Sequence, residues 1–262
     1  MVAYTPAFLP KKTYYPPTAL MKVQLFIPCF VDQFYPTTAV NMVKVLRKAG
    51  CEVTYNPHQT CCGQPAFNAG YVDAARPVCA KFLQDYDPAY YVVAPSSSCV
   101  GFFRNMYAGL FEEADGEMAK RYAALRPMVV EFSEFLVNVL KVTDFGAELH
   151  THATYHDACA ALRECHIKQE PRTLLANVRG LTLTESSDCE VCCGFGGTFA
   201  VKFEPVSIAM AEQKMNNAAA TGAQTLISAD WSCLMHLAGY ATTDHRDLKF
   251  MHLADVLASG WQ

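Results

Sequence analysis

The stretch QLFIPC at residues 24–29 is a short apolar run that favours a strand and ends at a cysteine. A segment with helical apolar spacing follows at residues 37–49 and stops at Gly50. A strand, a functional loop and a helix in this order are typical of an open α/β sheet, where ligands bind at the carboxyl ends of the strands. We therefore expect a parallel sheet with cysteine loops along one edge.

The same order recurs along the chain. In the first half, two more strand-like runs lead to cysteines with a helical segment between them, at residues 52–55, 90–94 and 72–84. The second half repeats the pattern with three strands and a long helix, at residues 153–156, 181–183, 225–228 and 206–221. The repetition predicts two tandem, pseudo-symmetric, Rossmann-like parallel-sheet domains of the α/β class.

The domain limits follow from composition. Residues 1–20 are rich in proline and lack periodicity, so we expect a flexible arm there. The first domain is expected at 21–148 and the second at 149–262, with two further helices at 112–126 and 131–140. With 262 residues, 52% of them hydrophobic, the chain can bury a substantial core.

Eight of the twelve cysteines form two sets with matching spacing. In each set a single cysteine precedes a Cys-Cys-Gly triplet and another cysteine follows it. The first cysteine frame is Cys29, Cys61, Cys62 and Cys99, and the second cysteine frame is Cys159, Cys192, Cys193 and Cys233. Adjacent cysteines do not readily form a disulfide with each other, but two thiolates can reach different metal atoms. Four sulfur donors per half suit an iron–sulfur cluster or zinc, not magnesium or calcium.

The other cysteines have no counterparts at matching positions. Cys51, Cys79 and Cys165 are interpreted as small buried side chains. Cys189 is a further candidate ligand because Cys-x-x-Cys spacing relates it to Cys192, although the first half has His58 at the equivalent place.

Three residues near Cys159 are candidates for catalysis. His156 and Asp157 could transfer a proton or orient a substrate carboxylate, with Arg163 as the counter-charge. The plainer interpretation, which we favour for Asp157, is an N-cap at the start of a helix.

Charge and hydropathy exclude several kinds of partner. The net charge is −4 with acids and bases mixed, so we expect no nucleic-acid partner. No apolar run approaches the ~20 residues that span a bilayer, and no signal peptide is recognisable, so we expect no membrane span and a cytoplasmic location. Cysteines in a reducing compartment favour metal or redox chemistry.

The two cysteine frames resemble the cysteine-rich CCG domain family of iron–sulfur oxidoreductases. This family includes the heterodisulfide reductase B subunit, the glycolate oxidase iron–sulfur subunit and the lactate-utilisation protein A group. The strings at residues 27–36, 59–65 and 190–199 are most similar to the lactate-utilisation protein A group. The resemblance covers about residues 22–260.

This resemblance implies an iron–sulfur subunit of a three-part L-lactate oxidation system, which transfers electrons as lactate becomes pyruvate. It implies one or two clusters per chain, [4Fe–4S] in type, on the eight frame cysteines, with zinc as a substitute occupant. It also implies two partner subunits, one with ferredoxin-like clusters. A small 2-hydroxy acid is a further candidate partner.

One departure from the wider family leaves alternatives open. Reductase-type members close each motif with Cys-x-x-Cys, whereas Ser96 and Asp230 stand at the first of those positions here. Four thiolates per half suffice for a [4Fe–4S] cube, a [2Fe–2S] cluster or zinc, with Ser96 or Asp230 as candidate oxygen donors. A zinc-stabilised interaction module and a thiol–disulfide oxidoreductase of the heterodisulfide reductase type are the alternative functions.

Overall fold

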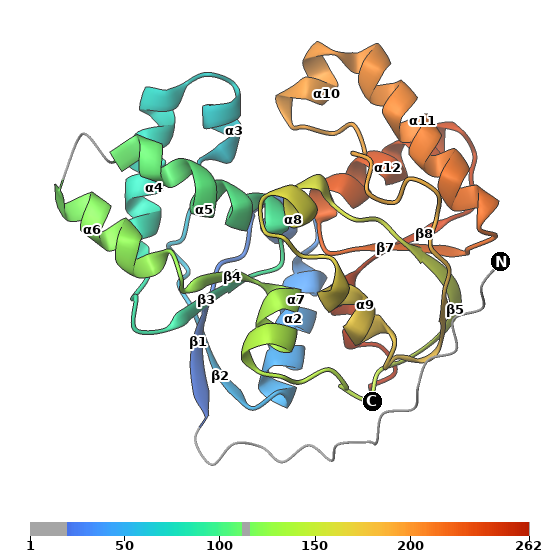
Figure 1. Cartoon of the computed structure of the whole chain (residues 1–262), viewed down its shortest axis with the longest axis horizontal. Coiled ribbons are helices and arrows are strands. Elements are labelled where there is room, and N and C mark those ends of the chain that lie inside the picture. The colour runs from blue at the N-terminus through green and yellow to red at the C-terminus, as the bar shows by residue number, and fades with distance from the viewer. Residues whose placement is uncertain (1–19, 112–115, 262) are drawn as a thin grey trace.

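Two four-stranded parallel sheets lie side by side in the computed structural model, which describes residues 20–111 and 116–261 (Figure 1). The first sheet has the order β2-β1-β3-β4, formed by β1 Met21–Leu25, β2 Cys51–Tyr55, β3 Tyr91–Ala94 and β4 Val129–Glu131. The second has the same order, β6-β5-β7-β8, formed by β5 Glu148–Tyr155, β6 Arg179–Leu183, β7 Thr225–Ser228 and β8 Lys249–His252. The predicted α/β class with two tandem parallel sheets is confirmed.

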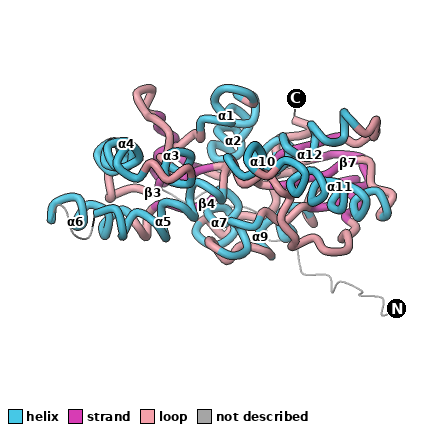
Figure 2. Tube along the Cα trace, turned by 90° about the horizontal axis from the view of Figure 1, so that it is seen from above, coloured by secondary structure: helices cyan, strands magenta, loops and turns pink. Residues whose placement is uncertain are grey.

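Helices flank the strands of both sheets (Figure 2). Those of the first half are α1 Cys29–Phe34, α2 Pro36–Lys48, α3 Gln64–Asn68, α4 Val72–Asp85, α5 Ser97–Phe111, α6 Gly116–Leu125, α7 Phe132–Glu134 and the π-helix η1 Phe135–Val139. Those of the second half are α8 Cys159–Arg163, α9 Gln169–Leu175, α10 Thr198–Lys202, α11 Glu204–Ala220, α12 Trp231–Thr243 and α13 Leu253–Leu257. Helix α8 lies near the middle of the molecule, between the two sheets (Figure 1).

Several predicted elements need correction. The first strand is Met21–Leu25, three residues earlier than the apolar run suggested, and each sheet has a fourth strand that was not predicted. The segment expected as one helix at 131–140 is helical over residues 132–139, but it is divided into α7 and the π-helix η1, and Glu131 belongs to β4. The strand β4 escapes prediction because it has only three residues and all three are buried, so it shows no period-two alternation. The expected arm falls almost wholly on residues 1–19, outside the described part of the chain.

The core of each half covers its central strands. Val23, Val92 and Val93 of β1 and β3 are fully buried, as are Ala153 and Ile227 of β5 and β7. Strands buried on both faces are typical of parallel sheets packed between helices. This burial keeps the strand ends, and the loops that follow them, in fixed positions.

The last helices of each half pack against the other half. Helix α13 of the second half packs on α2 of the first, and α7 with η1 of the first half packs on α9 of the second. Thr38 of α2 donates a hydrogen bond to Asp255 Oδ2 of α13 at 2.7 Å and accepts one from Trp231 Nε1 at 2.8 Å. The buried Thr38 hydroxyl therefore joins the halves through two polar contacts.

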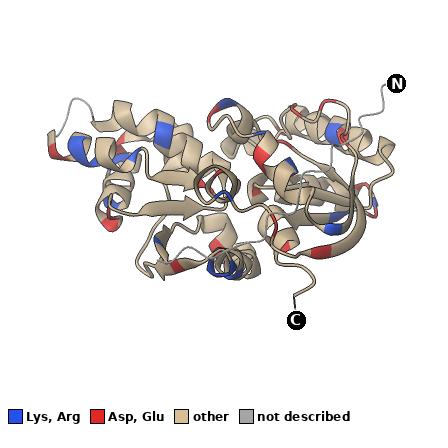
Figure 3. Cartoon of the chain, turned by 60° about the horizontal axis from the view of Figure 1, so that its bottom comes forward, with Lys and Arg blue, Asp and Glu red and all other residues tan. Residues whose placement is uncertain are grey.

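Positions of Lys and Arg and positions of Asp and Glu are interspersed along the ribbon of both halves in Figure 3. Within residues 20–111 and 116–261, none of the helices combines the length and apolar character needed to cross a membrane.

Replacing Thr38 by valine tests the contact between the halves. Thr38→Val keeps the side-chain volume but leaves Trp231 Nε1 and one Asp255 oxygen without their partner, so the free energy of unfolding should fall by about 1–3 kcal/mol. Urea denaturation measures this. The neighbouring exposed Thr37 gives the matched control, Thr37→Val, with an expected change within about 0.5 kcal/mol. Equal effects of the two substitutions would contradict the assignment.

Candidate metal centre

A single cavity of about 590 Å³ brings both cysteine frames together. Residues of both halves line it, and they include all eight frame cysteines: Cys29, Cys61, Cys62, Cys99, Cys159, Cys192, Cys193 and Cys233. All twelve cysteines of the chain lie in the described residues and are free thiols. Two sets of sulfur donors from distant parts of the sequence therefore face one shared space.

Sheet topology explains this convergence. In the first sheet, β2 lies on one side of β1 and β3 lies on the other, so the chain reverses its direction across the sheet between them. The carboxyl ends of β1 and β3 therefore form a topological switch point, where α/β proteins bind ligands. Cys29 begins α1 just after β1, and Cys159 begins α8 just after β5. Cys99 and Cys233 lie in the first turns of α5 and α12, just after β3 and β7.

The glycine of each triplet is required by the backbone. Gly63 has φ +93° and Gly194 has φ +94°, a left-handed conformation that other residues rarely adopt. A Cβ atom on Gly63 would lie 2.6 Å from Cys79 Sγ, and one on Gly194 would lie 2.7 Å from the Ser207 carbonyl oxygen. The Gly63 N–H donates to Cys61 Sγ, and the Gly194 N–H donates to Cys192 Sγ, each at 3.4 Å. Each turn thus directs a backbone donor at a sulfur atom.

The sulfur atoms of the first cysteine frame are crowded. Cys29 and Cys61 Sγ are 4.0 Å apart, and Cys62 and Cys99 Sγ are 3.3 Å apart. Hydrogen bonds from Cys29 and Cys62 lower the pKa of Cys61 to about 3, and the same bonds, together with burial, raise the pKa of both donors. One thiolate is thus stabilised by protons that its neighbours retain.

The second cysteine frame repeats this arrangement. Hydrogen bonds from Cys159 and Cys193 lower the pKa of Cys192 to about 2, and the pKa values of Cys159 and Cys193 are raised. A bound cation would compensate the charge of further thiolates and release their protons. Four free thiols per frame, directed at one cavity, therefore fit a thiolate-bound metal group.

Asp230 connects the two frames. Its Oδ2 accepts hydrogen bonds from Ser96 Oγ at 3.2 Å, Ser97 Oγ at 3.2 Å and Ser98 N at 3.0 Å, at the start of α5. Its Oδ1 accepts from Ser232 N at 3.1 Å and Ser232 Oγ at 2.6 Å, at the start of α12. Because five donors already bind the buried carboxylate, its role is to hold the two loops, and its oxygens are poorly placed to serve as metal ligands.

Aromatic side chains form part of the cavity wall. Phe30 of α1 packs edge-on against Phe195, with ring centroids 5.7 Å apart. Trp231 stacks on Tyr35 at 3.6 Å with an interplanar angle of 4°. Both pairs join the two halves and cover the site with apolar surface, which limits access of water to the sulfurs.

Asp157 does not have the role expected from its position. The N-cap of α8 is Ala158, without a side-chain cap, so the N-cap prediction for Asp157 is wrong. Asp157 is buried in an ion pair with Arg172 at 2.7 Å, so Arg163 is not its counter-charge. Arg172 lies on α9, beside the end of β5. The spacing of residues along α8 could not indicate that Arg172 pairs with Asp157.

His156 lies behind the cavity wall and is not among the residues that line it. Its side chain is buried, and burial, with a smaller effect of Lys214, lowers its pKa to about 3. Cys189 is likewise absent from the described cavity lining, and its carbonyl oxygen accepts a hydrogen bond from Lys214 Nζ at 2.9 Å. Burial raises the pKa of the Cys189 thiol.

Side chains that the sequence did not indicate fix the triplet backbones. Tyr107 OH donates to the Cys62 carbonyl at 2.6 Å, and Ser207 Oγ donates to the Gly194 carbonyl at 2.8 Å. Tyr107 lies on α5 after Cys99 and Ser207 lies on α11, and the cysteine spacing gives no signal for either of them. The three cysteines interpreted as packing residues are all buried and do not line the cavity: Cys51, Cys79 and Cys165.

Two cysteine frames on paired parallel sheets define an α/β protein with a thiol-lined cavity, and the comparisons agree with this class. The cysteine-rich CCG domain model matches residues 23–104 and 153–238. Lactate utilization protein A of Bacillus thuringiensis (strain Al Hakam) and of Bacillus cereus (strain AH187) are each 42% identical over 239 residues, covering 91% of this chain and 99% of the relative. The chain therefore belongs to the CCG cysteine-rich domain family, in the group of Lactate utilization protein A.

A solved structure shares the fold. A hypothetical protein from Helicobacter pylori matches with a TM-score of 0.62 and 11% identity, covering 95% of this chain and 52% of that protein. The chain thus corresponds to about half of that protein, and the likeness concerns the fold alone.

Substituting Asp230 tests its link between the frames. In Asp230→Asn an amide NH2 replaces one of the two carboxylate oxygens that accept hydrogen bonds from five donors. The donors that faced this oxygen lose their acceptor, so the free energy of unfolding should fall by about 3 kcal/mol. Metal bound after anaerobic reconstitution should fall in both frames together. The exposed Asp247 provides the control, since Asp247→Asn makes the same chemical change far from any such cluster of donors. A loss of metal from one frame only would contradict a shared role.

Proposed function

We propose that this chain is the iron–sulfur subunit of an L-lactate oxidation system and transfers electrons while lactate is converted to pyruvate. The observation that carries the proposal is the convergence of eight free thiols on one cavity, in a chain 42% identical to Lactate utilization protein A. Twelve free cysteines also support a reducing compartment, so we place its action in the cytoplasm.

The residues of each frame fit a [4Fe–4S] cluster with four thiolate ligands. Such a cluster, when bound, accepts and donates single electrons. The chain's own contribution is to hold the ligands: Gly63 and Gly194 turn the triplets, and Asp230 fixes the loops before Cys99 and Cys233. The aromatic wall restricts water, a factor that tunes cluster potentials.

Lactate itself is proposed to be oxidised on a partner subunit. Among the described residues, the cavity lining contains no lysine or arginine to pair with a small 2-hydroxy acid. Glu164 and Asp230 line it instead and would repel a carboxylate. This charge pattern supports a three-part complex in which this chain passes electrons, one partner carries ferredoxin-like clusters, and a partner binds the substrate.

A zinc-stabilised interaction module is the second candidate, and one observation favours it. Sulfur separations of 3.3 and 4.0 Å are close to the ~3.8 Å edge of a tetrahedron with Zn–S bonds of about 2.3 Å. The eight thiols share a cavity of about 590 Å³, however, which is more room than a zinc ion with four protein ligands needs. The cavity therefore favours the iron–sulfur proposal.

Metal analysis of single-frame variants tests the cofactor. Protein reconstituted anaerobically should contain about eight iron and eight sulfide per chain if each frame holds a [4Fe–4S] cluster. Cys61→Ser and Cys192→Ser should each remove about half of both. Cys51→Ala is the control because Cys51 is buried away from the cavity. Zinc without sulfide, persisting after iron and sulfide are supplied, would transfer support to the interaction module.

Growth on L-lactate tests the pathway. Deletion of the gene should abolish growth with L-lactate as the carbon source and leave growth on pyruvate intact. The wild-type chain and Cys51→Ala should restore growth, whereas Cys61→Ser and Cys192→Ser should not. Full restoration by both serine variants would show that lactate use does not depend on the frames.

A further inference from the structure

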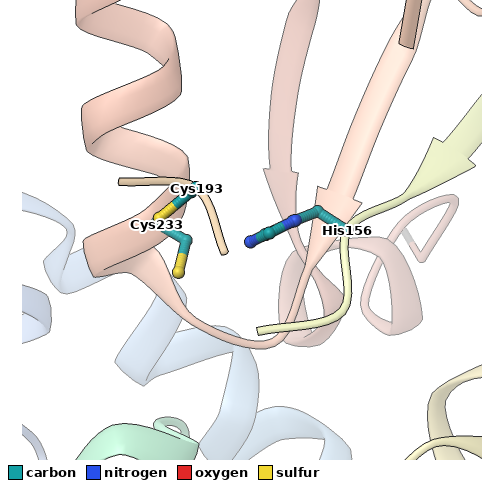
Figure 4. Close-up of side chains that lie close together, drawn as sticks. All are labelled: His156, Cys193 and Cys233. Carbon is teal, nitrogen blue, oxygen red and sulfur yellow. The ribbon is translucent and has the colours of Figure 1, made fainter. Parts of the chain in front are cut away.

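His156 precedes Cys159 by three residues and lies beside the second cysteine frame. It lies at the end of β5, is 2% exposed, and its ring is directed toward Cys193 and Cys233 (Figure 4). One ligand atom from each of these three residues lies within 4.8 Å of the others. Three separate segments, β5, the second triplet and α12, thus bring one nitrogen and two sulfur donors together.

The imidazole has no other partner. Within the described residues, neither Nδ1 nor Nε2 of His156 has a hydrogen-bond partner, although both are buried. A neutral imidazole carries one donor and one acceptor nitrogen, and leaving these unpaired in the interior costs free energy. Packing alone would be served better by an apolar ring. A metal between the ring and the two sulfurs would use the lone pair of a ring nitrogen.

In the first half, the position equivalent to His156 is occupied by the apolar residue Phe26. Phe26 precedes Cys29 by the same three positions, and its backbone N–H donates to Val93 O at 3.1 Å. The His156 N–H donates to Ile227 O at 2.8 Å, so the two residues occupy equivalent places in their sheets. The Phe26 ring packs against Phe82 and Tyr86 in the core. The first cysteine frame therefore offers only sulfur, whereas the second offers sulfur and nitrogen.

We propose that His156 is a metal ligand in the second cysteine frame, together with Cys193 and Cys233. The inference rests on the proposed function only in that the frame must hold metal. A neutral imidazole contributes no negative charge to the ligand set, and replacement of thiolate by imidazole raises the potential of iron–sulfur centres. A cluster with four ligand positions then binds His156 and three of the four frame thiolates, so the second site has a higher reduction potential than the all-thiolate first site.

Pulsed electron paramagnetic resonance of the reduced, anaerobically reconstituted chain tests the ligand directly. Protein labelled with ¹⁵N-histidine should show a hyperfine-coupled nitrogen, and His156→Phe should abolish that coupling. His156→Cys should retain metal, lose the nitrogen coupling and lower the potential of the second site. The control is His236→Asn, because His236 is also near Cys192 but already contacts Ser207 Oγ at 3.3 Å. Its coupling should match that of the wild type.

Other outcomes separate the two proposals. A wild-type signal without coupled nitrogen, or a coupling that persists in His156→Phe, overturns the assignment of His156 while leaving the cluster in place. If the wild-type chain takes up neither iron nor sulfide, the proposed function fails, and Co²⁺ becomes the probe. His156→Phe should then weaken Co²⁺ binding at least tenfold relative to His236→Asn, and equal affinities would overturn the inference.

Discussion

A buried carboxylate at the centre of the molecule organises both cysteine frames. Asp230 binds Ser98 N at the start of α5 and Ser232 N at the start of α12, so one side chain fixes the helices that carry Cys99 and Cys233. Ser96 is the residue equivalent to Asp230 in the first half, and the two are in contact at 3.2 Å. Equivalent residues that touch lie beside the pseudo-symmetry axis, and the shared cavity is built around this point.

The two cysteine frames share most of their features but differ at one position. The repeated sheet order, the glycine turns and the low pKa of Cys61 and Cys192 give the two frames the same basic chemistry. The difference between Phe26 and His156 changes the proposed ligand set of one frame without changing the backbone, since both N–H groups make the same sheet contact. A duplicated scaffold can in this way hold two metal groups of unequal potential on one cavity.

Much of this arrangement was predictable from local sequence. Apolar runs ending at cysteines indicated parallel strands with loops at one edge, because that pattern depends on neighbouring residues only. The strand β4 was missed because it has only three residues, all buried, and the π-helix because its five residues are too few to show a period of their own. The single cavity, the ion pair of Asp157 with Arg172, and the contact of Thr38 with Asp255 depend on how distant segments pack. No periodicity or spacing encodes such contacts, so local sequence signals identify the individual frames but not the cavity that they share.

Anomalous diffraction from crystals grown without oxygen tests the central claim that both frames hold iron on one cavity. Data collected at the iron and zinc absorption edges locate each metal and identify it. The account predicts iron beside Cys61 and Cys62 and iron beside Cys192 and Cys193, on facing walls of the same cavity. Iron at neither frame, or zinc alone at both after reconstitution with iron and sulfide, would contradict it.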